Sequence, residues 1–374
     1  MYNKNKATGV ANMAVRHKYS RFILRTVCIT GLTALYIINI SFNDILIKKE
    51  LAVSCTPVNY LAQNTAKGKE IKKPSLRYNK QIYSYYEMIQ DIDSLVKAHT
   101  GKIQKRIIGK SVLGRDIPVI ILGNPQAPKK IAVIGSIHGR EYIGTQLIMK
   151  QMEFYLNNPM HSFNQVYIVN QLQRVCIYFI PMLNPDGVML SQAGLNSVKN
   201  QKMKNMLLKL NKGSHNFKSW KANARGVDLN RNFNAGWKKI QYMPAGPEAY
   251  KGPYPLSEPE SWAVANYISK RNFNAVLTYH SAGQVVYWYY FQKGSSYNRD
   301  RKIADAIAYT TGYKLPPKGN KVSSGGLKDW YVQNYGRPGF TIELGEGESP
   351  LPFSQFSSIW KKNRYIPLLI SQQV

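Results

Sequence analysis

The sequence predicts an α/β fold built on a mixed, mostly parallel, twisted sheet with helices on both faces. Five short apolar runs, rich in β-branched or aromatic residues, predict buried strands at 117–122, 131–134, 175–180, 275–279 and 339–344. Helical periodicity occupies parts of the intervals between them, and strands that alternate with helices favour parallel pairing. The chain has 374 residues and 44% of them are hydrophobic, which suffices for one large domain.

The elements follow in order along the chain. A helix is predicted over 85–99, because its apolar residues share one face and Gly101 ends it; that face consists of Met88, Ile89, Ile92, Leu95 and Val96. The strands at 117–122 and 131–134 come next, followed by a helical pattern at 141–156 and the remaining three strands. In such sheets functional sites lie beyond the carboxyl ends of the strands, so the residues that follow each run are candidates for a site.

The amino end differs from the rest of the chain. Residues 1–25 carry Lys and Arg but no acid, which predicts a basic cytoplasmic terminus, and the uncharged, apolar residues 26–43 predict a transmembrane anchor or a signal segment. Residues 44–75 are polar and predict a linker, and one domain is expected over 76–374. This organisation predicts an exported protein, either held in the membrane and facing the cell exterior or secreted after cleavage.

Charge and composition restrict the class of partner. The chain has 51 Lys and Arg against 20 Asp and Glu, a net charge of +31. Residues 1–75 hold 12 of the basic and 3 of the acidic residues, which leaves 39 against 17 beyond them, so the excess is not confined to the terminus. An anionic wall polymer or a membrane surface is therefore an expected partner. No nucleic acid is expected, because no nucleic-acid recognition motif accompanies the charge. Three cysteines exclude a disulfide scaffold and a Cys-ligated zinc module.

Metal-binding residue types occur at the ends of three predicted strands. His138 and Glu141 lie three apart just after the strand at 131–134, and His280 follows the strand at 275–279. Two His and one Glu are a ligand set of catalytic Zn²⁺, which leaves one position for water. Glu343 interrupts an apolar strand, where an unpaired carboxylate is costly. It therefore indicates either a buried salt bridge or a base that takes a proton from that water.

A fourth cluster lies at 220–233. Arg225 and Arg231 are six apart, beside Asn223 and Asn230. Guanidinium groups bind carboxylates through two hydrogen bonds and stabilise oxyanions. Two exposed surface arginines could have the same spacing. The interpretation as a substrate site therefore depends on the presence of the three other clusters in the same chain.

Seven motifs, in this order, resemble the zinc carboxypeptidase (carboxypeptidase A/B-like) family from about residue 76 to near the end of the chain: HGRE (138–141), PMLNPDG (181–187), GVDLNRNF (226–233), SEPE (257–260), YHSAG (279–283), SGGLKDW (324–330) and TIELG (341–345). The resemblance implies a metallopeptidase with one Zn²⁺ ion. It implies that the ion is held by His138, Glu141 and His280, and that Glu343 is the general base acting on zinc-activated water.

The resemblance also implies roles around the metal. Arg225 would polarise the scissile carbonyl, and Asn230 and Arg231 would bind a substrate carboxylate. Arg140 would form a subsite, and Asp228 would orient His138 through a hydrogen bond, as metal-bound histidines usually require.

Two positions depart from the family pattern. Lys321 stands where the digestive members carry a mobile tyrosine that closes over the substrate. Lys328 stands at the residue that tunes the side-chain pocket, where an ammonium would favour a substrate with a second carboxylate. The alternative is a Lys328 that points to solvent.

Longer strings resemble the bacterial branch that cleaves γ-D-glutamyl-diamino acid bonds in peptidoglycan peptides: GKSVLGRDIPV, WKANARGVDLNRNF, YHSAGQVVYW and GGLKDW. The resemblance thus implies an exported peptidase of cell-wall stem peptides. One alternative is a general metallocarboxypeptidase that removes C-terminal L-amino acids, and Lys328 and Lys321 weigh against it. Another is a catalytically dead wall-binding protein, which is disfavoured because all the ligands and the base are present.

Overall fold

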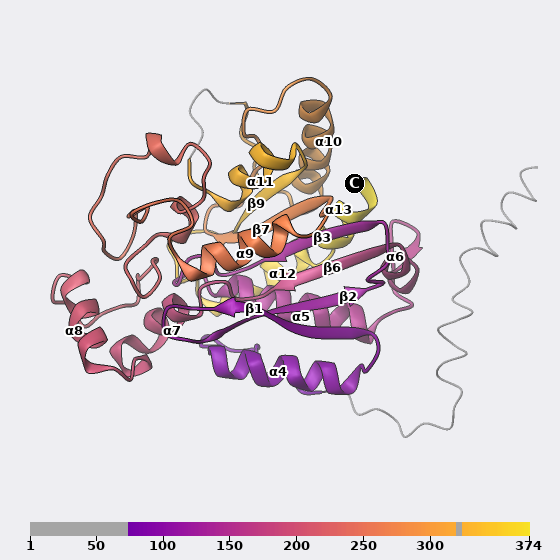
Figure 1. Cartoon of the computed structure of the whole chain (residues 1–374). Coiled ribbons are helices and arrows are strands. Elements are labelled where there is room, and N and C mark those ends of the chain that lie inside the picture. The colour runs from indigo at the N-terminus through magenta and orange to yellow at the C-terminus, as the bar shows by residue number, and fades with distance from the viewer. Residues whose placement is uncertain (1–73, 319–323) are drawn as a thin grey trace, which may run out of the picture. The chain divides into compact units, whose positions relative to one another are not determined.

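A seven-stranded sheet organises the residues that the computed structural model describes, 74–318 and 324–374 (Figure 1). The order across the sheet is β1-β2-β6-β3-β7-β9-β8. Strands β6, β3, β7 and β9 pair in parallel, whereas β1, β2 and β8 pair antiparallel at the two edges. The predicted mixed, mostly parallel sheet is confirmed. The strands are β1 (Ile103–Lys110), β2 (Asp116–Gly123), β3 (Lys129–Ile134), β6 (Val175–Ile180), β7 (Ala275–Ser281), β8 (Val285–Tyr287) and β9 (Gly339–Leu344), and β4 (Ser162–Phe163) pairs with β5 (Val166–Tyr167) in a separate hairpin.

Helices cover both faces of the sheet, as predicted (Figure 1). One face packs against α4 (Tyr85–Ala98), α5 (Ile143–Asn157), α10 (Gly294–Thr311), α12 (Phe356–Asn363) and α13 (Ile366–Gln373). The other packs against α9 (Pro259–Ser269) and α11 (Leu327–Tyr335). The shorter helices α6 (Ile168–Arg174), α7 (Pro185–Ala193) and α8 (Gln201–Leu210) lie between strands β5 and β7 in the chain.

Alternation along the central strands explains the two layers of core. In β3, Ile131 and Val133 point into one core, whereas Ala132 and Ile134 point into the other. A strand that is covered on both faces needs apolar residues at every position, which is why these runs are continuous in the sequence.

The predicted element boundaries agree closely with the structure. Strands β6 and β9 occupy the predicted 175–180 and 339–344, and α4 begins after Ser84, whose side chain caps the helix. Helix α5 begins two residues later than predicted, because Glu141 still belongs to the turn that follows β3. Strand β1 was not predicted; its burial alternates irregularly because it lies at an edge of the sheet.

The predicted basic terminus and the segment at 26–43 lie outside the described residues, as does all but the end of the predicted linker. Among residues 74–318 and 324–374, none of the helices has the length and apolar character needed to span a bilayer.

Candidate active site

The site forms where three parallel strands end at the same edge of the sheet. His280 is the penultimate residue of β7 and is the register partner of Glu343 in β9. His138 and Glu141 lie in the turn between β3 and α5. Because β3 and β9 flank β7, these three strand ends bring the predicted metal-binding residues together.

His138, Glu141 and His280 form one compact, buried donor set. His138 Nδ1 lies 2.9 Å from Glu141 Oε1, and His280 Nδ1 lies 2.9 Å from Glu141 Oε2 and 3.1 Å from His138 Nδ1. Two ligand atoms of a tetrahedral zinc, each about 2.1 Å from the ion, are separated by about 3.4 Å. The donor types and their separations therefore fit one Zn²⁺ ion.

Asp228 supports this donor set from behind. Its Oδ1 lies 3.1 Å from His138 Nε2, the ring nitrogen that faces away from the other donors. Burial alone would raise the pKa of Asp228, but His138 and the cations of Lys221 and Arg231 outweigh it, so the pKa is lowered. An ionised Asp228 that accepts from Nε2–H leaves Nδ1 of His138 free to bind a metal.

Replacing Asp228 with asparagine should lower zinc affinity about 10- to 100-fold, because the amide carries no charge to hold the His138 tautomer. Competition with a chromogenic chelator measures this affinity. Asp305→Asn, an exposed carboxylate on α10 that pairs with Arg301, is the matched control and should not change it. Equal zinc affinity in Asp228→Asn and the control would remove the supporting role.

The turn that carries His138 and Glu141 is built by close backbone contacts. Gly139 N–H donates to the carbonyl of Lys221 at 2.9 Å. The Asn184 side-chain amide donates to the carbonyls of Ile137 and Ala222, both at 3.1 Å, and so joins the HGRE turn to the loop at 220–233. The motifs at 138–141, 181–187 and 226–233 thus form one folded unit.

Replacing Gly139 with alanine should destabilise this unit by about 1–3 kcal/mol. A Cβ at Gly139 would overlap the backbone carbonyl of Gly187, which cannot rotate away. Gly246 is the matched control: a Cβ there has its nearest neighbours at 3.8 and 3.9 Å, so alanine should be neutral or slightly stabilising. Thermal unfolding in the presence of a chelator measures both changes, and an unchanged Tm for Gly139→Ala would contradict the packing argument.

A cleft of about 490 Å³ opens in front of the donor set. Its walls come from the turn after β3, the loop at 219–221, the ends of β7 and β9, and the segment that follows β9; they consist of His138, Arg140, Glu141, Ser219, Lys221, Ser281, Ala282, Tyr287, Glu343, Gly347, Glu348 and Ser349. Burial raises the pKa of the Glu343 carboxyl to about 7, although the neighbouring His280 opposes this rise. Glu343 lies in the cleft wall beside the metal-binding residues, and it does not belong to their donor set.

The other predicted site residues lie at different distances from this cleft. Arg140 is in its wall and donates from Nη1 to the Ser219 carbonyl at 3.2 Å. Asn230 and Arg231 adjoin Asp228: Arg231 Nε lies 3.7 Å from Asp228 Oδ2, and Asn230 N–H donates to Asp228 Oδ1 at 3.0 Å. Arg225 is exposed and is not one of the described residues in the cleft wall; its Nη1 lies 3.6 Å from Glu258 Oε2.

Lys328 points inward rather than to solvent. Its side chain is buried, donates to the Tyr289 carbonyl at 3.0 Å and forms an ion pair with Asp329. The ammonium is thus held between α11 and the segment that follows β8, with its charge balanced by the adjacent carboxylate.

Lys221 is a cleft residue that the sequence analysis did not select. Its Nζ lies 4.0 Å from Asp228 Oδ2. Its positive charge acts to lower the pKa of Glu343, which burial raises. The same charge acts to lower the pKa of His138, which the carboxylates of Glu141 and Asp228 raise. The sequence could have indicated it, because Lys221 directly follows Trp220 in the cluster at 220–233 that was predicted to belong to the site. The seven lysines of 198–221 made it resemble part of a solvated face.

An α/β domain with a buried His-Glu-His donor set and an adjacent carboxylate is the arrangement of a zinc-dependent hydrolase. The family model for zinc carboxypeptidases matches residues 88–366, and the chain belongs to this family. It is 36% identical over 290 residues to a γ-D-glutamyl-L-diamino acid endopeptidase of Lysinibacillus sphaericus, and the aligned region covers 75% of this chain and 70% of the relative. It is 28% identical over 284 residues to human carboxypeptidase A6, which covers 71% of this chain and 61% of the relative.

Solved structures show the same fold. The crystal structure of thrombin-activatable fibrinolysis inhibitor superposes with a TM-score of 0.66 at 20% identity, covering 83% of this chain and 78% of the other. The carboxypeptidase A of Helicoverpa armigera gives 0.64 at 20% identity, covering 87% and 81%. The predicted family, enzyme class and zinc cofactor are confirmed.

Proposed function

We propose that this zinc peptidase hydrolyses the γ-D-glutamyl-diamino acid bond of peptidoglycan stem peptides. The observation that carries the proposal is the 36% identity to a γ-D-glutamyl-L-diamino acid endopeptidase over a region that includes the whole zinc site. The cleft supports it, since its cations, Arg140 and Lys221, suit a substrate that carries more carboxylates than an ordinary peptide.

The chain's own residues supply the remaining chemistry. Bound zinc would polarise the scissile carbonyl and acidify a water molecule. Glu343 takes a proton from the attacking water as the water oxygen bonds to the carbonyl carbon. The carbon–nitrogen bond then breaks, and Glu343 returns the proton to the leaving amine. A carboxylate in the cleft wall, beside the metal donors, can take up a proton and return it in this way. The Lys221 ammonium stabilises the negative charge that develops on the carbonyl oxygen.

Substrate positioning falls to residues around this centre. Asn230 and Arg231, next to Asp228, bind a carboxylate on the leaving side of the bond. Arg140 contacts the acyl side from the cleft wall. Lys328 does not offer a free ammonium to the substrate, because Asp329 balances its charge and the Tyr289 carbonyl accepts from it. A role for Arg225 at the scissile carbonyl stays a prediction.

The test uses the full chain loaded with zinc. It is incubated with L-Ala-γ-D-Glu-meso-diaminopimelate and, separately, with ordinary L-peptides, and the products are identified by mass spectrometry. Release of diaminopimelate, absent in Glu343→Gln, is the expected result. Release of C-terminal L-amino acids alone would favour the general metallocarboxypeptidase, and zinc binding without cleavage of either substrate would favour a wall-binding protein.

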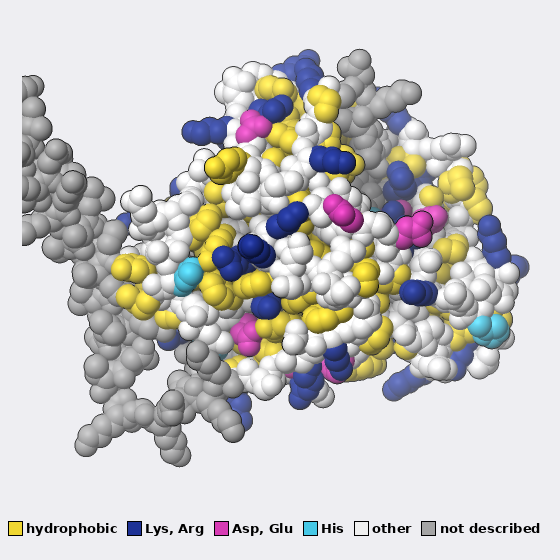
Figure 2. Space-filling view, turned by 180° about the vertical axis from the view of Figure 1, so that it is seen from behind, with side chains coloured by type: hydrophobic (Ala, Val, Ile, Leu, Met, Phe, Trp, Pro, Cys, Tyr) yellow, Lys and Arg dark blue, Asp and Glu magenta, His cyan; other side chains and the backbone are white. Residues whose placement is uncertain are grey.

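We also propose that the protein is exported and held near the wall by its charge. Lys and Arg side chains occur in several places on the face shown in Figure 2, with fewer Asp and Glu between them, and the whole chain carries a net charge of +31. Retention on purified cell walls should therefore fall as ionic strength rises, because salt screens exposed charges. Retention that salt does not change would exclude this electrostatic attachment.

A further inference from the structure

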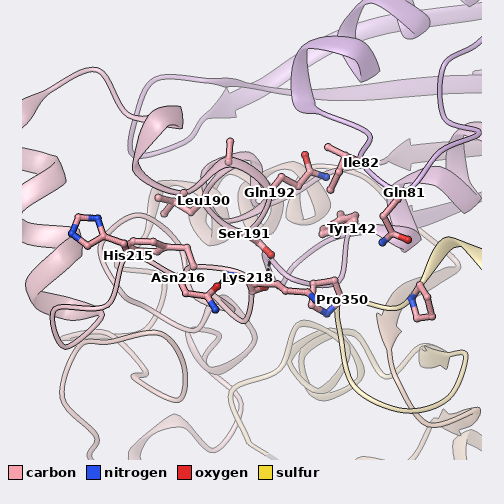
Figure 3. A pocket seen from close by; sticks show the side chains of 14 residues that line it. Gln81, Ile82, Tyr142, Leu190, Ser191, Gln192, His215, Asn216, Lys218 and Pro350 are labelled. Carbon is pink, nitrogen blue, oxygen red and sulfur yellow. Dashed lines mark hydrogen bonds between the residues drawn. The ribbon is translucent and has the colours of Figure 1, made fainter.

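A second hollow, here called the distal groove, lies beside the cleft and encloses about 640 Å³. Figure 3 shows α7 residues together with Gln81 and Ile82 along one side and the segment 215–218 along the other, with His215 and Pro350 toward opposite ends. Its size is that of pockets that hold small organic ligands, about 300–1,000 Å³.

The distal groove continues the cleft. Three separate segments each supply residues to both hollows. Glu141 lies in the cleft wall and Tyr142 in the groove wall, and the same holds for Ser219 and Lys218 and for Ser349 and Pro350. A bound chain that leaves the cleft past these pairs therefore enters the distal groove directly.

The direction of the substrate follows from the proposed function. Asn230 and Arg231 hold the carboxylate of the leaving side, and the Asn230 side chain accepts from the Leu327 N–H at 3.0 Å, at the start of α11. The described residues of the distal groove come from 81–82, 142, 190–194, 215–218, 350 and 352, and none comes from 225–231 or 324–331. The groove is thus reached by the acyl side of the substrate, which runs toward its amino end.

The walls of the distal groove suit a polar, non-basic occupant. Amide and hydroxyl groups come from Gln81, Gln192, Asn216 and Ser191, and a cation comes from Lys218. Each of these four amide and hydroxyl side chains already bonds to backbone groups of this chain, so a ligand would use the donors and acceptors that these bonds leave over. Apolar surface comes from Leu190, Ile82 and the two prolines, and no described residue of the wall is acidic. Hydroxyl and acetamido groups can hydrogen-bond to such amides while the ring faces of a sugar pack on the apolar surface.

We propose that the distal groove binds the N-acetylmuramoyl group that acylates the amino end of a peptidoglycan stem peptide. This inference rests on the proposed function. In such a substrate D-Glu occupies the cleft next to the broken bond, L-Ala follows it, and the saccharide comes next along the chain. The enzyme then prefers stem peptides still attached to sugar over free peptides.

The test compares two substrates that share one scissile bond, L-Ala-γ-D-Glu-meso-diaminopimelate with and without the N-acetylmuramoyl group. Wild type should cleave the muramoyl peptide with a kcat/KM about tenfold higher. Ala193→Trp adds bulk at an exposed alanine in the groove wall and should remove most of this preference. Ser295→Trp, exposed on α10 outside the groove, is the control and should retain it. Equal kcat/KM on the two substrates in wild type would overturn the proposal.

A binding measurement separates this proposal from the proposed function. Calorimetry would measure binding of N-acetylmuramoyl-L-Ala-D-Glu to zinc-loaded full-length Glu343→Gln protein, with and without Ala193→Trp. Binding that Ala193→Trp removes, in a protein whose wild type cleaves neither substrate, would retain the distal groove and refute the proposed bond. Cleavage of the free peptide without detectable binding of this ligand would refute the groove and retain the bond.

Discussion

Replacing Glu343 with glutamine is expected to lower kcat by about 10²- to 10⁴-fold while the zinc site stays filled. The carboxyl group lies in the cleft wall, and its strand register places it beside His280. Glutamine has the same shape but cannot take a proton from water or return one to the leaving amine. The three metal donors belong to other residues, so the ligand set is untouched.

Zinc content by elemental analysis and kcat on the preferred substrate together measure this change. Glu346→Gln is the matched control, because Glu346 is an exposed carboxylate three residues further along the same segment and does not line the described cleft. Its kcat should stay close to wild type. A Glu343→Gln protein with normal zinc and near-normal kcat would show that another group moves the proton.

The sheet was predictable because its central strands are buried on both faces. A continuous apolar run of six residues such as VCIYFI is too short for a buried helix and is typical of a buried strand. Strand β6 has the predicted bounds. Strand β1 has the sequence IQKRIIGK, in which an exposed Ile107 and a register irregularity between Ile107 and Gly109 obscure the alternation. Edge strands are stabilised by pairing with a neighbour, and that pairing leaves little trace in local composition.

The metal donors were predictable for a related reason. In a parallel sheet the strand ends share one edge, so residues that follow different strands meet whatever their separation in the chain. His138 and His280 are 142 residues apart, yet their Nδ1 atoms lie 3.1 Å from each other. The rule that sites lie beyond the carboxyl ends of parallel strands, together with the family resemblance, was enough to select them.

The loop at 220–233 was not predictable in the same way, because distant contacts determine its shape. The Asn223 side chain accepts from the N–H groups of Arg225 and Val227 at 3.0 and 3.1 Å and donates to Glu258 and Glu260 at 2.7 and 3.1 Å. These bonds direct Arg225 outward, toward Glu258. The spacing of charged residues does not encode a turn whose partners lie about 35 residues away. The distal groove could not be predicted for the same reason, since five separate segments of the chain line it.

Replacing Lys221 with alanine is expected to lower kcat/KM by about 10²- to 10³-fold, the loss typical of removing one group that stabilises a developing oxyanion. The ammonium lies in the cleft and is close to Asp228, whereas the Arg225 guanidinium is exposed beside Glu258. Arg225→Ala should therefore cost less than about tenfold.

Lys221→Arg separates charge from packing in the same experiment. It keeps the positive charge and should recover most of the lost kcat/KM. Coulomb stabilisation of an oxyanion requires a cation in the cleft, and either an ammonium or a guanidinium group can supply it. Zinc occupancy is measured in each variant, since Lys221 also stabilises the ionised form of Asp228. A larger loss in Arg225→Ala than in Lys221→Ala, at equal zinc occupancy, would assign the carbonyl to Arg225 and require the loop to rearrange when substrate binds. The opposite order would make Lys221 the cation at the scissile carbonyl and leave Arg225 to the packing of the loop against Glu258.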